Sequence, residues 1–443
     1  MAKGQGEIMS VSPPQSSIGR GASAAAVPVY YRCMAVVAIA LLAVLPQARA
    51  GARDDTAAPR TNLQVTLWDS GVATEREALS QLLFSFQRAN PDVIVCLEWK
   101  DQALQAEWVP RWCGDYRSYA PDLTVMSEQL AWEHRHELLA LPEALARELR
   151  QACDPAVMRR LPGPARAIPW RVSTRALYYR PDLLSASELT APVTLEELAD
   201  RAEALADPPA RYGLGLPRPL GGGEELLHAL GRAQGSAQLE VDEPGPTLSD
   251  GSSDGSRGGR PDYETALELL VGLQSRGALQ PETLTWSERE LVELFAQGRL
   301  AMMIAPIEAA RMLKDMEDAA AWAVAPLPMA PAGSGAVEVQ QLVAFGDTDR
   351  QDAAVRLMRY IAEKESQRML AMMPSVPAMR ELTEELSAVS PWSAHVASLR
   401  AAEGVPLASW KRLRPLLGDA LVYALSGRKT AREALSEAMA VAR

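Results

Sequence analysis

Predicted strands and helices alternate from the first folded segment of the chain, and this alternation constrains the fold more than any other feature. "LQVTLWD" (Leu63–Asp69) is apolar and β-branched enough to predict a strand, and a helical pattern of leucines follows it as far as Asn90-Pro91. "VIVCLEW" (Val93–Trp99) and "PDLTVMS" (Pro121–Ser127) predict the next two strands. This order implies parallel strands covered by helices, so the predicted class is α/β.

A similar change from helix to strand is predicted later in the chain. In "LFAQGRLAMMIAP" (residues 294–306) a helical face ends at Gly298, and the apolar run Leu300–Ala305 follows it. A short apolar run between Gly and Pro predicts a strand buried in an α/β sheet. Residues 235–261, in contrast, are mostly Gly, Ser, Asp and Pro, which predicts a disordered surface loop within the second lobe described below.

The N-terminus has the pattern of an export signal. Arg20 and Arg32 precede an apolar run of about fourteen residues, Cys33–Pro46, and "ARA" (Ala48–Ala50) offers a small-x-small cleavage site. The run is shorter than the roughly 20 residues that cross a bilayer. We therefore predict a cleavable signal peptide over residues 1–50 and a periplasmic or extracellular mature protein, with an uncleaved N-terminal anchor as the alternative.

Length and charge limit the kinds of partner. The 443 residues suffice for two or three domains. The formal net charge is −11, and because residues 1–50 carry a net +3, the remaining residues carry −14. A surface this acidic disfavours nucleic acids and anionic lipids as partners.

Three cysteines follow the predicted cleavage site: Cys96, Cys113 and Cys153. Export permits a disulfide, and Cys96 and Cys113 are the nearest pair in the sequence. We expect one bridge and one buried thiol.

Signatures of enzymes and metal sites fail on their context. "GSSDG" (Gly251–Gly255) matches the nucleophile motif G-x-S-x-G, but it lies in the predicted loop and not between a strand and a helix. "EHRHE" (Glu133–Glu137) lacks the spacing that places two histidines on one helix face. We therefore expect no catalytic residue, no metal site and no cofactor.

Tryptophan is frequent, with ten residues against four phenylalanines. Trp68, Trp99 and Trp170 stand where predicted strands end, which is where ligands bind in open α/β sheets. A half-exposed indole suits the C–H face of a sugar ring, whereas core packing is the alternative for each of them.

Eight segments, in order along most of the mature chain, resemble the extracellular solute-binding proteins of family 1, which serve carbohydrate ABC importers. They include "VTLWDSG", "LLFSFQRANPDVIV", "APDLTVMS", "AIPWRVSTRALYYRPDLL" and "FAQGRLAMMI". The resemblance implies a two-lobed, periplasmic-binding-protein-like (type II) α/β fold with a hinge that the chain crosses three times. It places lobe one at residues 63–172 plus 340–379, and lobe two at residues 173–339 plus 380–443.

Matching these segments residue by residue implies a set of ligand-binding side chains. The tryptophans would stack on the ligand and the polar groups would bind its hydroxyls. The set is Trp68, Asp69, Ser70, Ser127, Glu128, Gln129, Trp170, Arg171, Ile307, Glu308, Gln340 and Trp410. Ile307 stands where relatives often carry a tryptophan that stacks on sugar.

The resemblance implies an exported, monomeric binding protein, not an enzyme, that captures a carbohydrate or related polyol in the cleft between its lobes. It would deliver this ligand to the permease subunits of an ABC importer. Arg171 and Arg175 leave room for an anionic ligand such as a sugar phosphate. The alternatives are a secreted hydrolase with an unrecognised site and a membrane-anchored sensory or scaffold protein.

Overall fold

The structure is a computed structural model of the whole chain. It describes residues 60–69, 73–161, 165–219, 221–234, 262–328, 337–373, 375–402 and 407–442. The predicted signal peptide (residues 1–50) and the predicted loop (residues 235–261) lie outside these ranges. Among the described residues, no helix combines the length and the apolar character needed to cross a membrane.

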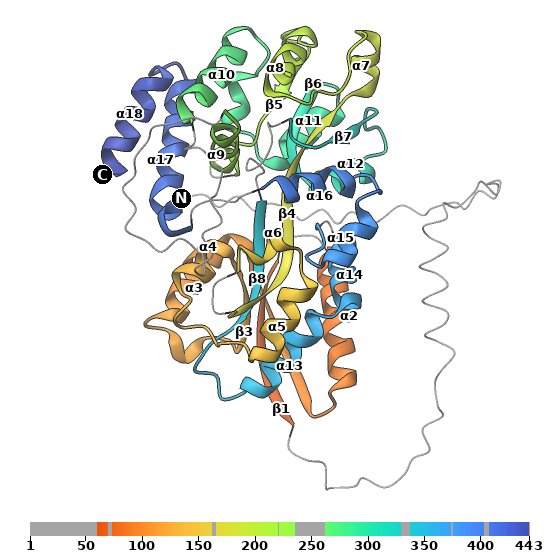
Figure 1. Cartoon of the computed structure of the whole chain (residues 1–443), viewed down its shortest axis with the longest axis vertical. Helices are drawn as coiled ribbons and strands as arrows, with labels where there is room; N and C mark the ends of the chain where they lie inside the picture. Colours follow the sequence, from red (N-terminus) through yellow and green to blue (C-terminus); the bar gives the residue numbers. More distant parts are fainter. Residues whose placement is uncertain are drawn as a thin grey trace, which may run out of the picture. The chain divides into compact units, whose positions relative to one another are not determined.

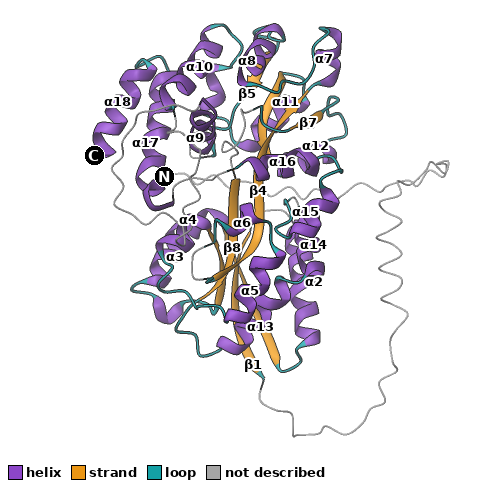
Figure 2. Ribbon diagram, in the orientation of Figure 1, coloured by secondary structure: helices purple, strands orange, loops and turns teal. Residues whose placement is uncertain are grey.

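The described strands, orange in Figure 2, form one mixed sheet. Their order is β2-β1-β3-β8-β4-β6-β5, and β7 pairs with β4. β1 is parallel to β2 and β3, as predicted, and β5 is parallel to β6, whereas β8 and β4 pair antiparallel with their neighbours. The strands are β1 (Thr61–Asp69), β2 (Val93–Asp101), β3 (Leu123–Ser127), β4 (Ala167–Tyr179), β5 (Tyr212–Gly215), β6 (Leu300–Pro306), β7 (Ala323–Ala325) and β8 (Val337–Ala344).

Helices cover this sheet and make the α/β class plain (Figure 1). The α-helices are α2 (Ala73–Ala89), α3 (Gln105–Cys113), α4 (Glu128–Glu133), α5 (Glu143–Ala152), α6 (Pro155–Met158), α7 (Pro181–Ala186), α8 (Leu195–Ala204), α9 (Gly223–Gln234), α10 (Tyr263–Ser275), α11 (Glu288–Ala296), α12 (Glu308–Asp315), α13 (Gln351–Ile361), α14 (Lys364–Met372), α15 (Arg380–Leu386), α16 (Trp392–Ala401), α17 (Leu407–Leu425) and α18 (Ala431–Ala442). Short 3-10 turns lie at Gln102–Leu104, Arg117–Tyr119 and Pro281–Leu284.

The predicted change from helix to buried strand is confirmed. α11 ends at Ala296, and Gly298 has a φ of 75°, a left-handed conformation that glycine adopts without strain. All seven residues of β6 are buried, as expected for a strand covered on both faces.

Strand β4 belongs to both parts of the sheet. Its first half pairs with β8, as far as Thr174 opposite Val337. Its second half pairs with β6, beginning with Arg175 opposite Pro306. The change of partner therefore falls between two consecutive residues.

Two large apolar cores lie along the sheet. One includes Leu63, Leu123 and Val343 from β1, β3 and β8. The other includes Leu214 of β5 and Leu417 of α17, together with residues of α9 and α10. Burial of such side chains is the main force that holds each part together.

The predicted disulfide is wrong, because the three cysteines that the structure describes are all free thiols. Nearness in sequence did not predict nearness in space. After Cys96 the chain continues β2 to Asp101 and then forms α3, which ends at Cys113, so no tight turn joins the two cysteines. Burial also raises the pKa of Cys113 and of Cys153 to about 12, which disfavours the reactive thiolate. The expectation of a buried thiol is met by Cys153.

Candidate functional site

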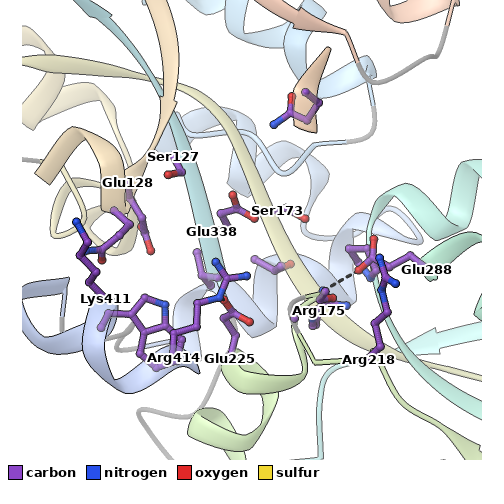
Figure 3. A pocket seen from close by; sticks show the side chains of 18 of the residues that line it. Ser127, Glu128, Ser173, Arg175, Arg218, Glu225, Glu288, Glu338, Lys411 and Arg414 are labelled. Atoms are coloured by element: carbon purple, nitrogen blue, oxygen red, sulfur yellow. Dashed lines mark hydrogen bonds and ion pairs between the residues drawn. The ribbon is translucent and has the colours of Figure 1, made fainter. Parts of the chain in front are cut away.

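A cavity of about 690 Å³ opens where β4 and β8 meet helices α4, α9 and α17 (Figure 3). Its volume is within the range of small-molecule sites. Charged side chains dominate its lining: Glu128, Arg175, Arg218, Glu225, Glu288, Glu338, Lys411 and Arg414. Four are acidic and four are basic, so the lining offers both donors and acceptors of hydrogen bonds.

Arg175 enters this cavity at the point where β4 changes partner. Its Nη2 donates to the backbone oxygen of Gly221 at 2.9 Å and to Glu288 Oε1 at 2.7 Å, the ion pair dashed in Figure 3. The guanidinium lies so close to Gly222 that a Cβ there would be 1.9 Å from Nη2. Gly222 also has a φ of 104°, so both the space and the backbone require glycine.

We expect Gly222→Ala to lower the free energy of unfolding by about 2–4 kcal/mol, because it combines a strained backbone with a displaced arginine. Gly427→Ala is the matched control, since Gly427 has a φ of 69° but nothing within 4 Å of an added Cβ. It should cost about 1 kcal/mol, from the backbone alone. Urea unfolding of both variants measures the difference, and equal losses would contradict the close approach of Arg175.

Glu128 is the most deeply buried charge of the lining. It begins α4 directly after β3, and the Oγ of Ser127 accepts from the N–H of Leu130 as an N-cap. Arg160 binds the carboxylate through two hydrogen bonds of 2.8 and 2.9 Å, and both side chains are 7% exposed. Burial raises the pKa of Glu128 to about 7, although Arg160 opposes this rise.

Helix α17 places two cations over the cavity. Arg414 Nε lies 3.3 Å from Glu225 Oε1 on α9, and Lys411 Nζ lies 2.7 Å from Glu133 Oε2 on α4. Glu338 of β8 forms no ion pair with the described residues, and in Figure 3 it lies between Glu128 on the left and Arg175 on the right. Although its side chain reaches solvent in the cavity, the protein around it and the nearby Glu225 raise its pKa.

Four buried polar atoms of this lining have no hydrogen-bond partner among the described residues. Two are acceptors, Gln129 Oε1 and Glu225 Oε2. Two are donors, Arg175 Nη1 and Arg414 Nε, and the second of them keeps its ion pair with Glu225. Buried polar atoms are rarely left without a hydrogen bond, so these four make the cavity a candidate binding site, although similar atoms occur elsewhere among the described residues, such as Nε and Nη2 of Arg171.

A second, small pocket of about 20 Å³ adjoins the cavity and shares Gln102 with it. Trp68 is 8% exposed here, and its Nε1 donates to the backbone oxygen of Val125 at 2.6 Å. Arg171 Nη2 lies 2.9 Å from Glu75 Oε2. The indole N–H of Trp68 therefore has a protein partner, and Arg171 has an ion-pair partner, although Nε and Nη2 of Arg171 are buried without a hydrogen bond to the described residues.

The predicted site residues divide between these places, and their binding roles stay predictions. Four line the cavity: Ser127, Glu128, Gln129 and Trp410. Four line the small pocket: Trp68, Trp170, Arg171 and Gln340.

The remaining four residues of the predicted set line neither space in the described structure. Glu308 Oε2 accepts from Ser173 Oγ, a cavity residue, at 3.1 Å. Ile307 is 2% exposed and belongs to the core. Asp69 ends β1, with its side chain outside the described structure, and Ser70 lies wholly outside it.

Sequence reasoning missed most of the charged lining. The residues that it did not name as ligand-binding are Arg218, Glu225, Glu288, Glu338, Lys411 and Arg414, and it named Arg175 only in connection with an anionic ligand. They come from segments far apart in the chain, so no local motif joins them. One weak signal exists in "VEVQ", where Glu338 and Gln340 make one face of the strand polar and the two valines make the other apolar.

The comparison with known families decides the identity. A sequence profile described as "Bacterial extracellular solute-binding protein" matches residues 141–368, just over half of the chain. The chain belongs to this family. No curated protein sequence matches this solute-binding protein significantly.

Solved structures similar to this solute-binding protein are two-lobed binding proteins, which confirms the predicted fold class. The GacH receptor of Streptomyces glaucescens, solved unliganded and with acarbose, has 18% identity and a TM-score of 0.70 over 86% of this chain and 97% of that chain. Maltose-bound MalE3 of T. maritima has 19% identity and a TM-score of 0.70 over 86% and 99%. An ABC transporter solute-binding protein of Agrobacterium radiobacter with ribitol has 18% identity and a TM-score of 0.69 over 87% and 98%.

Proposed function

We propose that this solute-binding protein captures a neutral carbohydrate or polyol in the 690 Å³ cavity and delivers it to an ABC importer. The observation that carries the proposal is a mixed set of buried atoms in one cavity without a hydrogen bond to the described residues, two acceptors and two donors, of which only Arg414 Nε has an ion pair. A hydroxyl group both donates and accepts, so a polyhydroxylated ligand satisfies all four atoms. A fully ionised phosphate group only accepts and an ammonium group only donates, so neither group by itself satisfies both kinds of atom.

Arg171 and Arg175, which made an anionic ligand conceivable from the sequence, support the choice of a neutral ligand. Arg171 pairs with Glu75, and Arg175 pairs with Glu288 at 2.7 Å. Their positive charge is therefore balanced within the protein, while Arg175 Nη1 keeps a free donor direction. Such charge-balanced donors bind a neutral hydroxyl without attracting a full negative charge.

The similar structures support the ligand class. They were solved with acarbose, maltose and ribitol, all of them rich in hydroxyl groups. Membership of an extracellular solute-binding family supports export and delivery to permease subunits. The same membership supports binding without catalysis. We also propose lobe boundaries near residues 172, 339 and 379, where the resemblance placed the three hinge crossings, and the partner change of β4 after Thr174 lies close to the first of them.

A thermal-shift panel of sugars, sugar alcohols and sugar phosphates tests this function. We expect at least one neutral polyhydroxylated compound to raise the melting temperature of the mature protein in a saturable way, because it binds the folded state alone. Chromatography of the same mixtures should show the compound unchanged. Turnover of the compound would favour the hydrolase alternative, and a shift with sugar phosphates alone would favour an anionic ligand.

A further inference from the structure

We infer that the preferred ligand is a short, acyclic polyol held by hydrogen bonds, and not an oligosaccharide held by aromatic stacking. This inference rests on the proposed function and narrows its ligand class. The three similar structures do not decide the matter, because they include both kinds of ligand. The side chains that line the cavity of this chain favour the acyclic polyol.

The cavity offers no free aromatic face among its described lining residues. Trp410 is the one aromatic side chain of that lining, and it is 4% exposed. Its ring packs edge-on against His228, with centroids 5.5 Å apart and an interplanar angle of 65°, within the apolar core of helices α9 and α17. A sugar ring that needs an indole face to stack on finds none here.

The adjoining small pocket does not supply the missing surface. Trp68 and Trp170 are 8% and 4% exposed, and Trp68 packs against Trp112 with centroids 5.8 Å apart. Trp99 is half-buried, and the guanidinium of Arg76 lies 5.3 Å from its ring centroid. The volume of about 20 Å³ is also too small for a second ring.

The lining instead offers charged donors and acceptors on several sides. Arg175 comes from β4, Glu225 from α9 and Arg414 from α17, and each has a buried polar atom without a hydrogen-bond partner. A pyranose ring would press its apolar C–H face against some of these groups and desolvate them without compensation. An acyclic polyol has a hydroxyl on each carbon and rotates about each bond, so it can turn a hydroxyl toward each group.

Calorimetry of the mature protein with ribitol, mannitol, glucose, maltose and maltotriose tests the inference. We expect ribitol or mannitol to bind at least tenfold more tightly than glucose, maltose or maltotriose. Tightest binding of maltose or maltotriose would overturn the inference and leave the proposed function intact. Absence of binding across this panel and the wider thermal-shift panel would overturn both.

Glu225→Gln tests the mechanism with little change of shape. It keeps the volume of the side chain but replaces a carboxylate oxygen by a neutral group, so the affinity for the best polyol should fall about tenfold. Glu264→Gln is the matched control, since Glu264 pairs with the exposed Arg432 outside the cavity. Unchanged polyol affinity in Glu225→Gln, with a melting temperature like that of the control, would overturn the role of Glu225 as a hydrogen-bond acceptor for the polyol.

Discussion

Replacement of Arg160 by methionine should destabilise the folded protein by about 3–5 kcal/mol, because it leaves the carboxylate of Glu128 buried without a cation. Both side chains are only 7% exposed, so water cannot take the place of the guanidinium. Urea unfolding at pH 7.5 measures the loss. Arg359→Met, which breaks the exposed pair with Glu148, should cost less than about 1 kcal/mol under the same conditions.

The loss in Arg160→Met should depend on pH. A carboxyl whose pKa is higher in the folded state favours folding at low pH and loses that contribution as the pH rises through the folded-state pKa. Glu128 has a pKa of about 7 in the folded protein against an ordinary 4.5, and removal of Arg160 raises it further. The difference from the wild type should therefore be largest above pH 7 and shrink toward pH 5.

The double variant Glu128→Gln with Arg160→Met separates charge from packing. It removes the unpaired carboxylate, so it should recover part of the stability that the single variant loses. A single variant whose loss stays the same from pH 5 to pH 8 would contradict the buried-charge explanation and point to lost packing.

Arg175→Met should weaken binding of the best polyol about 100-fold, the effect expected when a charged donor is lost from a buried site. Arg175 holds Gly221 and Glu288 through Nη2, so the substitution removes both a ligand donor and the support of the cavity wall. Isothermal titration with the ligand found in the panel measures the affinity. Stability should change little, because Glu288 is 41% exposed and water can solvate it.

Arg289→Met is the matched control for this experiment. Arg289 lies on the same helix as Glu288 and pairs with Glu293, but it is 79% exposed and lies outside the cavity lining. Its affinity should equal that of the wild type. Equal affinities in both variants would remove Arg175 from the binding site, whereas a loss in both would indicate that α11 as a whole had moved.

Much of the fold was predictable because its signals are local. β1, β2 and β3 begin within two residues of the predicted strands, since each is an apolar run set off from the neighbouring helices by Pro or polar residues. The pairing of β4 with both β8 and β6 has no such signal, because its partners come from distant parts of the chain. Resemblance to a family, rather than periodicity, supplied the two lobes.

The candidate site was less predictable, for a related reason. Residues beside a predicted strand end, such as Ser127 and Gln129, were found because strand ends are a general place for ligands. Arg414 and Lys411 lie on one long helix whose pattern shows only an amphipathic surface. Trp68 also stands at a strand end, but its indole is packed and hydrogen-bonded inside the protein, and its stacking role stays a prediction.

The partner change in β4 lies in the wall of the candidate cavity. Ser173, Thr174 and Arg175 line the cavity, and between Thr174 and Arg175 the strand passes from β8 to β6. Any rotation of one half of the sheet against the other must twist the backbone at this point. Under the proposed function, a ligand bound to Arg175 would therefore contact the sheet at the very step where its two halves join.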